Sequence, residues 1–368
     1  MVDYTVAVAS GAPTARCKRE PRAVARYARP LLAHWRGGRR RHVPRRPVRR
    51  GGPAAECDAV GNFVGTAGDG PIEVVLLGHI DTVPGEIPVE ERDGKLWGRG
   101  AVDAKGPMAA FASTALRLAA GGRLDKLKLT VVGAVGEEGD SRGARYIVDR
   151  YRPSHLVIGE PSGWDSVVLG YKGSLRLAYT YTRTVRHSAG PDEAAPETAV
   201  RFWQRVKSYA DDFNTGRKVF DQLSPSLRAI SSRTDGLSDT VEMDVGMRLP
   251  LDFGPEALEP ILREWAEDAT IEIAFGDPAV RGEKSTPLVG AFVAALRDAG
   301  VRPRFKVKTG TSDMNVVAPV WRCPMIAYGP GDSSLDHTPD EHIGLAEFDS
   351  AVAILEDALL NLNKADRS

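Results

Sequence analysis

The stretch IEVVLLGHIDTVPG, residues 72–85, begins as an apolar run and ends on a histidine and an aspartate. Its first half is rich in valine and leucine, which is typical of a buried strand. Polar groups at the tip of such a strand cost stability unless they find partners. Pro84 and Gly85 then break the strand pattern. We therefore expect His79 and Asp81 to lie at a strand end, where other side chains or a ligand bind them.

Strand and helix patterns alternate around this stretch. A hairpin with glycine-rich turns precedes it, and a second hairpin, with Asp93 and Gly94 at its turn, follows it. Further along, helices are predicted over 106–122 and 141–151, and strands over 127–139 and 155–161. This alternation predicts an α/β domain with a mostly parallel sheet and helices on both faces.

The pattern changes near residue 171. Residues 172–281 predict the order β-α-β-β-α-β, which forms a small antiparallel sheet packed against two helices. After residue 282 the α/β pattern resumes, and it ends in a helix over 345–364. We therefore expect one α/β domain made of residues 1–171 and 282–368, with an α+β domain, residues 172–281, inserted into it.

The composition is that of an ordinary globular protein: 368 residues, 42% hydrophobic and 27% charged. No apolar run reaches the roughly 18 residues of a membrane span, and the first residues lack the basic region of a signal peptide. Three cysteines form an odd, sparse set that suits a reducing compartment better than a disulfide framework. We expect a cytoplasmic protein with no membrane partner.

The net charge of zero hides an arginine-rich block. Residues 11–50 hold 13 arginines and one lysine against the single acid Glu20, which leaves 35 basic and 48 acidic residues elsewhere. One interpretation is an arm for nucleic acid or an acidic partner. It has few aromatic residues and no recognisable binding fold, so we expect no nucleic-acid partner. The alternatives are a solvated stretch, or residues 11–57 as the product of a shifted reading frame.

Five separate segments of the α/β domain place a histidine or a carboxylate at or near a strand end. Ligands bind at the carboxyl ends of strands in open α/β sheets, so these side chains are expected to converge on one edge. Two imidazoles and several carboxylates suit Zn²⁺ or a similar divalent ion, and so many acids would repel one another without it. The cluster consists of His79, Asp81, Asp103, Glu137, Glu138, Glu160 and His337.

The cluster can be divided into ligands and helpers. Residues i and i+2 of a strand face the same way, so Asp81 can orient His79. Asp103, in a glycine-flanked loop, can bridge two ions that clamp a water nucleophile. Of the adjacent Glu137 and Glu138, one can bind metal while the other acts as general base. Each motif alone has an ordinary structural explanation, such as a helix cap or a solvated turn, but together they predict a dinuclear site.

Five motifs, in this order and spacing, resemble the M20 family of zinc amidohydrolases, the relatives of acetylornithine deacetylase, succinyl-diaminopimelate desuccinylase and carboxypeptidase G2. The resemblance covers about residues 58–368, whereas residues 10–57 do not match the opening segment of the family. It implies a metal-dependent hydrolase of linear amides. The motifs are GHIDTVPG (78–85), GRGAVDAKGPMAAF (98–111), GEEGDSRGA (136–144), GEPSGW (159–164) and DHTPDEHI (336–343).

The resemblance also implies a function for each residue of the cluster. Glu137 would be the general base, and Asp81 would orient His79. Two divalent ions would be present, Zn²⁺ first by ligand type, with Co²⁺ or Mn²⁺ able to replace it. One ion would be held by His79, Asp103 and Glu160, and the other by Asp103, Glu138 and His337.

For the inserted domain, the resemblance implies a lid and a dimerisation surface. His187 would reach across a homodimer to stabilise the oxyanion, and Arg248 would bind the substrate carboxylate. Gly310, Thr311 and Ser312, in the segment KTGTSDMN, would contact the same carboxylate. An exposed loop histidine and an edge-strand arginine are the structural alternatives for His187 and Arg248.

Within the family, residues 81–107 and 329–343 are most similar to hydrolases that act on an amino-group carrier protein. These release lysine or ornithine from the C-terminal glutamate of a small acidic carrier of the LysW type, in lysine biosynthesis by the 2-aminoadipate route and in arginine biosynthesis. Deacylation of N-acetylornithine or succinyl-diaminopimelate is the alternative. A metal-dependent binding protein without catalysis is a different class, against which the intact Glu137 argues.

Overall fold

The computed structural model describes residues 54–187 and 192–364, so the arginine-rich block and most of the stretch with the frameshift interpretation lie outside the described residues. The chain forms two compact units. Within the described residues, the first unit comprises 54–169, 282–306 and 317–364, and the second comprises 170–187, 192–281 and 307–316. None of the described helices is both long enough and apolar enough to cross a membrane.

The first unit is built on a mixed sheet whose strands follow the order β1-β2-β6-β3-β7-β15-β8. The middle strands β6, β3, β7 and β15 are parallel, while β1, β2 and β8 pair antiparallel. This confirms the predicted α/β class with a mostly parallel sheet. The strand bounds are β1 (Ala54–Cys57), β2 (Phe63–Ala67), β3 (Ile72–His79), β6 (Leu127–Ala134), β7 (His155–Gly159), β8 (Ser166–Tyr171) and β15 (Met325–Ala327).

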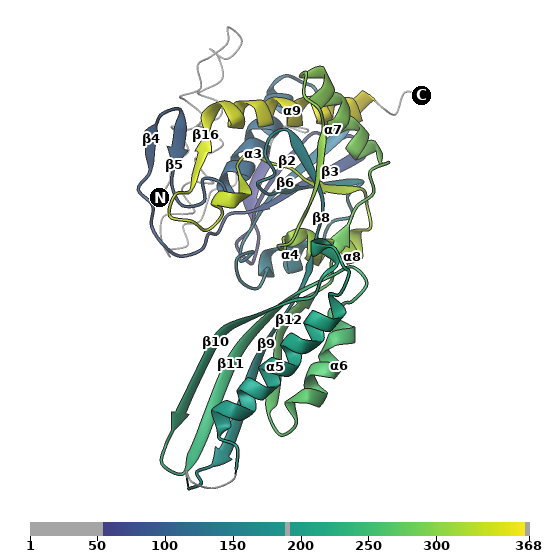
Figure 1. Ribbon diagram of the computed structural model, residues 1–368. Coiled ribbons are helices and arrows are strands. Elements are labelled where there is room, and N and C mark those ends of the chain that lie inside the picture. The colour runs from purple at the N-terminus through teal and green to yellow at the C-terminus, as the bar shows by residue number, and fades with distance from the viewer. Residues whose placement is uncertain (1–53, 188–191, 365–368) are drawn as a thin grey trace. The chain divides into compact units, whose positions relative to one another are not determined.

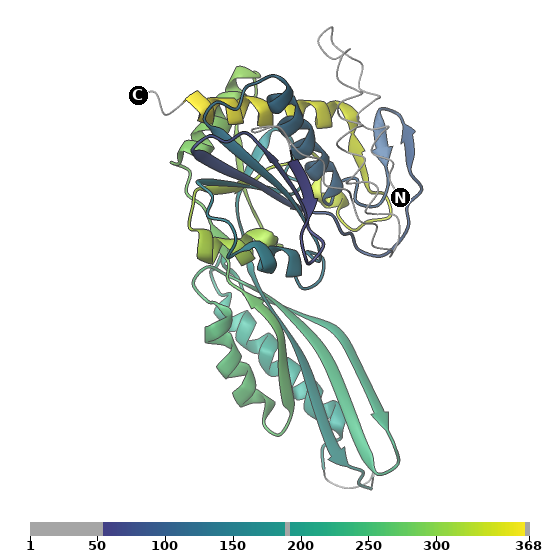
Figure 2. The ribbon, with the colours of Figure 1, turned by 180° about the vertical axis from the view of Figure 1, so that it is seen from behind.

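Helices α3 (Lys105–Ala120), α7 (Pro287–Asp298) and α9 (Leu345–Lys364) cover one face of this sheet, and α4 (Arg142–Ile147) lies on the other (Figures 1 and 2). The apolar faces of α3, α7 and α9 form one core with the strands, which includes Phe111, Phe292 and Leu355. Helix α3 packs closely on β3, because a Cβ at Gly78 would lie only 2.6 Å from Sδ of Met108. This close packing brings the start of α3 beside the end of β3.

A small second sheet in the first unit joins segments that are distant in sequence. Strand β16 (His342–Gly344) pairs antiparallel with β5 (Lys95–Trp97), which pairs with β4 (Glu90–Arg92). The register places His342 opposite Trp97, and the two rings lie 4.2 Å apart. The loop that carries Asp103 begins after β5, and the loop that carries His337 ends at β16. Both loops are therefore attached to the same small sheet.

The second unit is a four-stranded antiparallel sheet with the order β10-β11-β9-β12. Helices α5 and α6 pack on one face of it (Figure 1), and its β-α-β-β-α-β order is the predicted one. On β11 the buried Val241, Met243 and Val245 alternate with less buried polar residues, as one covered face requires. The bounds are β9 (Gly173–Thr184), α5 (Ala195–Phe213), β10 (Ser224–Thr234), β11 (Ser238–Leu249), α6 (Pro255–Ala266) and β12 (Thr270–Asp277).

Residues 307–316 belong to the second unit, although the sequence pattern placed them in the α/β domain. The Lys172 main-chain N–H donates to the carbonyl of Lys308 at 3.1 Å. The Asn315 side chain donates to the carbonyls of Lys172 and Pro278 at 3.0 and 2.8 Å. Pattern analysis also missed β8 and helix α8 (Asp313–Trp321), and it did not predict the short strands β13 (Val280–Arg281) and β16; it did predict a strand at β14 (Arg304–Lys308).

Candidate metal centre

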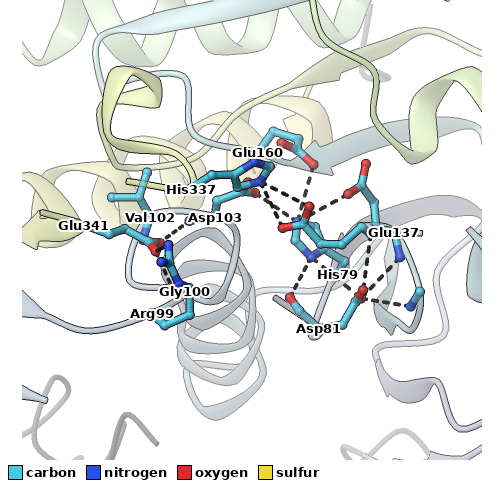
Figure 3. Close-up of polar contacts among 12 residues, drawn as sticks. His79, Asp81, Arg99, Gly100, Val102, Asp103, Glu137, Glu160, His337 and Glu341 are labelled. Atoms are coloured by element: carbon cyan, nitrogen blue, oxygen red, sulfur yellow. Dashed lines mark hydrogen bonds and ion pairs between the residues drawn. The ribbon is translucent and has the colours of Figure 1, made fainter. Parts of the chain in front are cut away.

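The seven residues of the predicted cluster all lie in the first unit, at the carboxyl end of its parallel strands. Figure 3 labels all of them except Glu138. His79 is the last residue of β3 and is paired with Ala134, at the end of β6. Glu160 directly follows β7, whose Gly159 pairs with Gly78. Because these strands end side by side, residues from different segments meet at one edge.

The carboxylate of Asp103 lies between the two histidines. Its Oδ1 is 3.0 Å from Nε2 of His79, and its Oδ2 is 2.9 Å from Nε2 of His337. A further carboxylate lies beside each imidazole: Oε1 of Glu160 is 3.9 Å from Nε2 of His79, and Oε2 of Glu138 is 3.1 Å from Nε2 of His337. The result is two half-sites, each with one imidazole and one glutamate, which share the two oxygens of a single aspartate.

The donor set suits a divalent cation. One ligand atom each from His79, Asp103 and Glu138 lie within 4.8 Å of one another. The cluster has five carboxylates against two imidazoles, and the His79 side chain is only 1% exposed. Imidazole nitrogens and carboxylate oxygens are ligands that Zn²⁺ accepts in catalytic sites, and cations would relieve the repulsion among the acids.

The carboxylates of the site raise the pKa values of both histidines, which means that they favour positive charge at these positions. Burial lowers the pKa of His79, but the hydrogen bond to Asp103 and the charges of Glu137 and Glu160 outweigh burial and raise it well above its ordinary value. The hydrogen bond to Asp103 raises the pKa of His337 to about 9, although burial opposes it. Burial raises the pKa of Glu138. Burial works against Asp103 too, but its hydrogen bonds to both histidines hold its pKa well below the usual range.

These shifts predict how the stability of the metal-free protein depends on pH. A histidine with a raised pKa in the fold stabilises the fold below its ordinary pKa and loses that contribution as the pH rises through the raised value. In the presence of a chelator, the melting temperature is therefore expected to fall as the pH rises from about 6.5, the ordinary pKa of histidine, to about 9, the pKa of His337. Calorimetry across pH 6–10 measures it; a flat or rising profile would contradict the prediction.

Two controls isolate the histidines in this experiment. His337→Asn is expected to flatten part of the decline, because it removes one of the two shifted groups. Added divalent metal is expected to remove the decline, because metal binds the neutral imidazole and replaces the proton.

Asp81 contacts His79 through its main chain. Nδ1 of His79 lies 3.0 Å from the Asp81 carbonyl oxygen and 3.8 Å from Oδ1 of the same residue. Since a carbonyl only accepts, Nδ1 carries a hydrogen, which leaves Nε2 for a metal. The Asp81 carboxylate accepts hydrogen bonds from the main-chain N–H groups of Gly136, Glu137 and Glu138, at 2.9, 3.3 and 3.2 Å. It thus holds the loop of both glutamates, a contact that sequence analysis did not predict.

The predicted substrate residues lie in the second unit. Nη1 of Arg248, on β11, donates to Oγ1 of Thr311 at 2.6 Å, so the structure brings these two residues together. Ser312 is buried, and its main-chain N–H donates to Oδ1 of Asn315 at 2.9 Å. His187 is exposed and follows the end of β9. A Cβ at Gly310 would meet nothing within 4 Å, so the chain at this position is open.

Sequence analysis missed Glu341, which lies beside the Asp103 loop in Figure 3. It stands four residues after His337, in the motif DHTPDEHI, and its side chain is 1% exposed. The signal in the sequence was an acid within a motif that already contained a predicted ligand. Nothing in the pattern distinguished it from its neighbour Asp340.

The chain is similar to known hydrolases over most of its length. Over 321 residues the chain is 42% identical to a [LysW]-lysine hydrolase of Deinococcus radiodurans, covering 85% of this chain and 88% of the relative. It is 40% identical to a provisionally named [LysW]-lysine/[LysW]-ornithine hydrolase of Thermococcus kodakarensis, covering 85% and 83%. A solved Bacillus subtilis structure, described as a dinuclear metal binding peptidase from the M20 family, has the same fold, with a TM-score of 0.60, 13% identity and coverage of 86% and 89%.

The family model described as Peptidase family M20/M25/M40 matches residues 75–361, a range that contains all seven residues of the cluster and most of both units. The chain therefore belongs to peptidase family M20/M25/M40.

Proposed function

We propose that this protein is a metal-dependent amide hydrolase that releases L-lysine or L-ornithine from the C-terminal glutamate of an acidic amino-group carrier protein of the LysW type. The observation that supports the chemistry is the position of Asp103, which presents one oxygen to His79 and the other to His337. The choice of substrate is supported by the 42% identity to a [LysW]-lysine hydrolase.

In this proposal His79, Asp103 and Glu160 hold one ion, and Asp103, Glu138 and His337 hold the other. Zn²⁺ is the first choice because imidazole and carboxylate are its usual ligands in catalytic sites, and Co²⁺ accepts the same set. When bound, two such ions would polarise the scissile carbonyl and activate a water molecule.

Glu137 moves the proton. Its Oε2 lies 4.0 Å from Nε2 of His79, so it stands at the edge of the cluster. It would take a proton from the attacking water and deliver it to the leaving α-amino nitrogen, so that one amide bond is broken and one carboxylate is formed. The Asp81 carboxylate accepts a hydrogen bond from the main-chain N–H of Glu137 and so holds Glu137 for this transfer.

The second unit would bind the amino acid. Arg248 suits the free carboxylate of lysine or ornithine, because a guanidinium can donate two parallel hydrogen bonds. Its bond to Thr311 supports a shared site with Gly310 and Ser312. We propose that His187 serves the partner protomer of a homodimer by stabilising the oxyanion, and that the protein works in the cytoplasm.

The substrate assignment predicts a clear preference. Metal-loaded protein is expected to cleave carrier-linked lysine or ornithine with a kcat/KM at least about 100-fold above that for N-acetylornithine or succinyl-diaminopimelate, which is about 2.7 kcal/mol in the transition state. Mass spectrometry of the carrier and amino-acid analysis measure release. The Glu137→Gln variant is the control for contaminating hydrolases. If only a small N-acyl substrate were turned over, the carrier-linked amino acid would be rejected as the substrate and the deacylase alternative would be supported.

A further inference from the structure

Glu341 is a buried carboxylate that accepts hydrogen bonds from the loop carrying Asp103 (Figure 3). Its Oε1 accepts hydrogen bonds from the main-chain N–H groups of Val102 and Asp103, at 2.9 and 3.1 Å. Its Oε2 accepts one from the N–H of Gly100, at 3.0 Å. Three main-chain donors of one loop therefore converge on one side chain, and hydrogen bonds to an ionised carboxylate are stronger than neutral ones.

Arg99 completes this arrangement. Its Nη1 lies 3.0 Å from Oε2 of Glu341, and the same nitrogen donates to the carbonyl of Thr338 at 3.1 Å. Its Nε donates to the carbonyl of Gly85 at 3.0 Å. Arg99 thus ties the Asp103 loop both to the residue after His337 and to the segment that follows β3.

The ion pair between Arg99 and Glu341 is far more buried than a surface ion pair. The Glu341 side chain is 1% exposed and that of Arg99 14% exposed. Leaving either charge buried without its partner would be costly, so the loop is held in one arrangement. The main-chain N–H of Asp103 is itself one of the bonded groups, so any shift of Glu341 is passed directly to the shared aspartate.

We propose that Arg99 and Glu341 form a positioning clamp that sets where the Asp103 carboxylate lies between the two metal positions. The inference rests on the dinuclear centre of the proposed function. The clamp joins the segments of Asp103 and His337, whereas His79 is held by strand β3 and Glu160 directly follows β7. The ion beside His337 and Glu138 therefore depends on the clamp more than the ion beside His79 and Glu160.

The test counts metal ions rather than activity alone. Purified metal-free protein is titrated with Co²⁺ by calorimetry, with the d–d absorption spectrum recorded in parallel and folding checked by circular dichroism. The wild type is expected to bind two ions. Glu341→Gln is expected to keep one of them near wild-type affinity and to weaken the other about 10- to 100-fold, the usual effect of changing a group that supports a ligand.

Glu356→Gln is the matched control. Glu356 is also a mostly buried carboxylate of the first unit, and it pairs with Arg117 and Arg123. It is expected to keep both ions. If Glu341→Gln does not fold, Arg99→Gln serves instead, because it leaves in place the three main-chain N–H groups that donate to Glu341. The same loss of affinity for one ion is expected.

The outcomes are distinct. A folded clamp variant that binds both ions with wild-type affinity overturns the clamp, and so does an equal loss of both ions. A wild type that binds fewer than two ions rejects the dinuclear centre, and with it the proposed function on which the clamp rests.

Discussion

Glu137→Gln is expected to lower kcat on carrier-linked lysine by about 10²- to 10⁴-fold, the contribution of a positioned general acid–base. The amide has the same shape but cannot take the proton of water or return it to the leaving amine. The side chain is largely buried, and its main-chain N–H still donates to Asp81, so the loop should keep its place. KM should change little, because the reaction barrier rises while ground-state binding is unaffected.

Metal analysis separates this result from a loss of ligands. Glu137→Gln should retain two ions per chain. The neighbouring Glu138→Gln is the matched control: Glu138 lies 3.1 Å from Nε2 of His337, and its replacement should weaken the ion at that position. A Glu137→Gln enzyme with unchanged kcat would show that another group moves the proton.

Asp103→Ala is expected to have the largest effect on metal binding. It removes the one carboxylate whose two oxygens face both histidines, at 3.0 and 2.9 Å. In the proposed ligand sets each ion would lose a charged ligand, so the affinity of both should fall by more than the roughly 10- to 100-fold typical of outer-shell changes. Turnover should fall below detection at micromolar metal.

The measurement is metal content after dialysis, followed by activity at increasing Zn²⁺ or Co²⁺. Asp140→Asn is the control, because Asp140 is an acid of the nearby loop whose side chain is 65% exposed and pairs with Arg142. It should behave as wild type. If Asp103→Ala retained two ions, Asp103 could not be the shared ligand.

Most of the site could be predicted because parallel strands give a simple rule. Strands β6, β3 and β7 end side by side, so residues that follow them in sequence must meet in space. His79, Glu138 and Glu160 were found in this way. Asp103 and His337 lie in loops, so predicting their positions required the further assumption that these loops turn toward that edge. The structure places both residues there.

The contacts that hold these residues could not be predicted. Asp81 was expected to face His79 because the two share a strand face, yet its carboxylate is 3.8 Å from the imidazole and bonds to the N–H groups of Gly136–Glu138. Glu341 gave no signal beyond its place in a motif. In both cases a carboxylate binds the main chain of a distant loop, and main-chain N–H groups are the same in every sequence.

By itself, the sequence determined the α/β class, the β-α-β-β-α-β order of the second unit and which residue types gather at the sheet edge, because periodicity and strand ends are local properties of the chain. Only the tertiary structure decided that residues 307–316 join the second unit, and that the Glu341 carboxylate accepts hydrogen bonds from the main chain of the Asp103 loop. These depend on distances between segments that are far apart in the sequence, such as Glu341 and Gly100, which are separated by 241 residues. Such distances are set by packing, which no local pattern records.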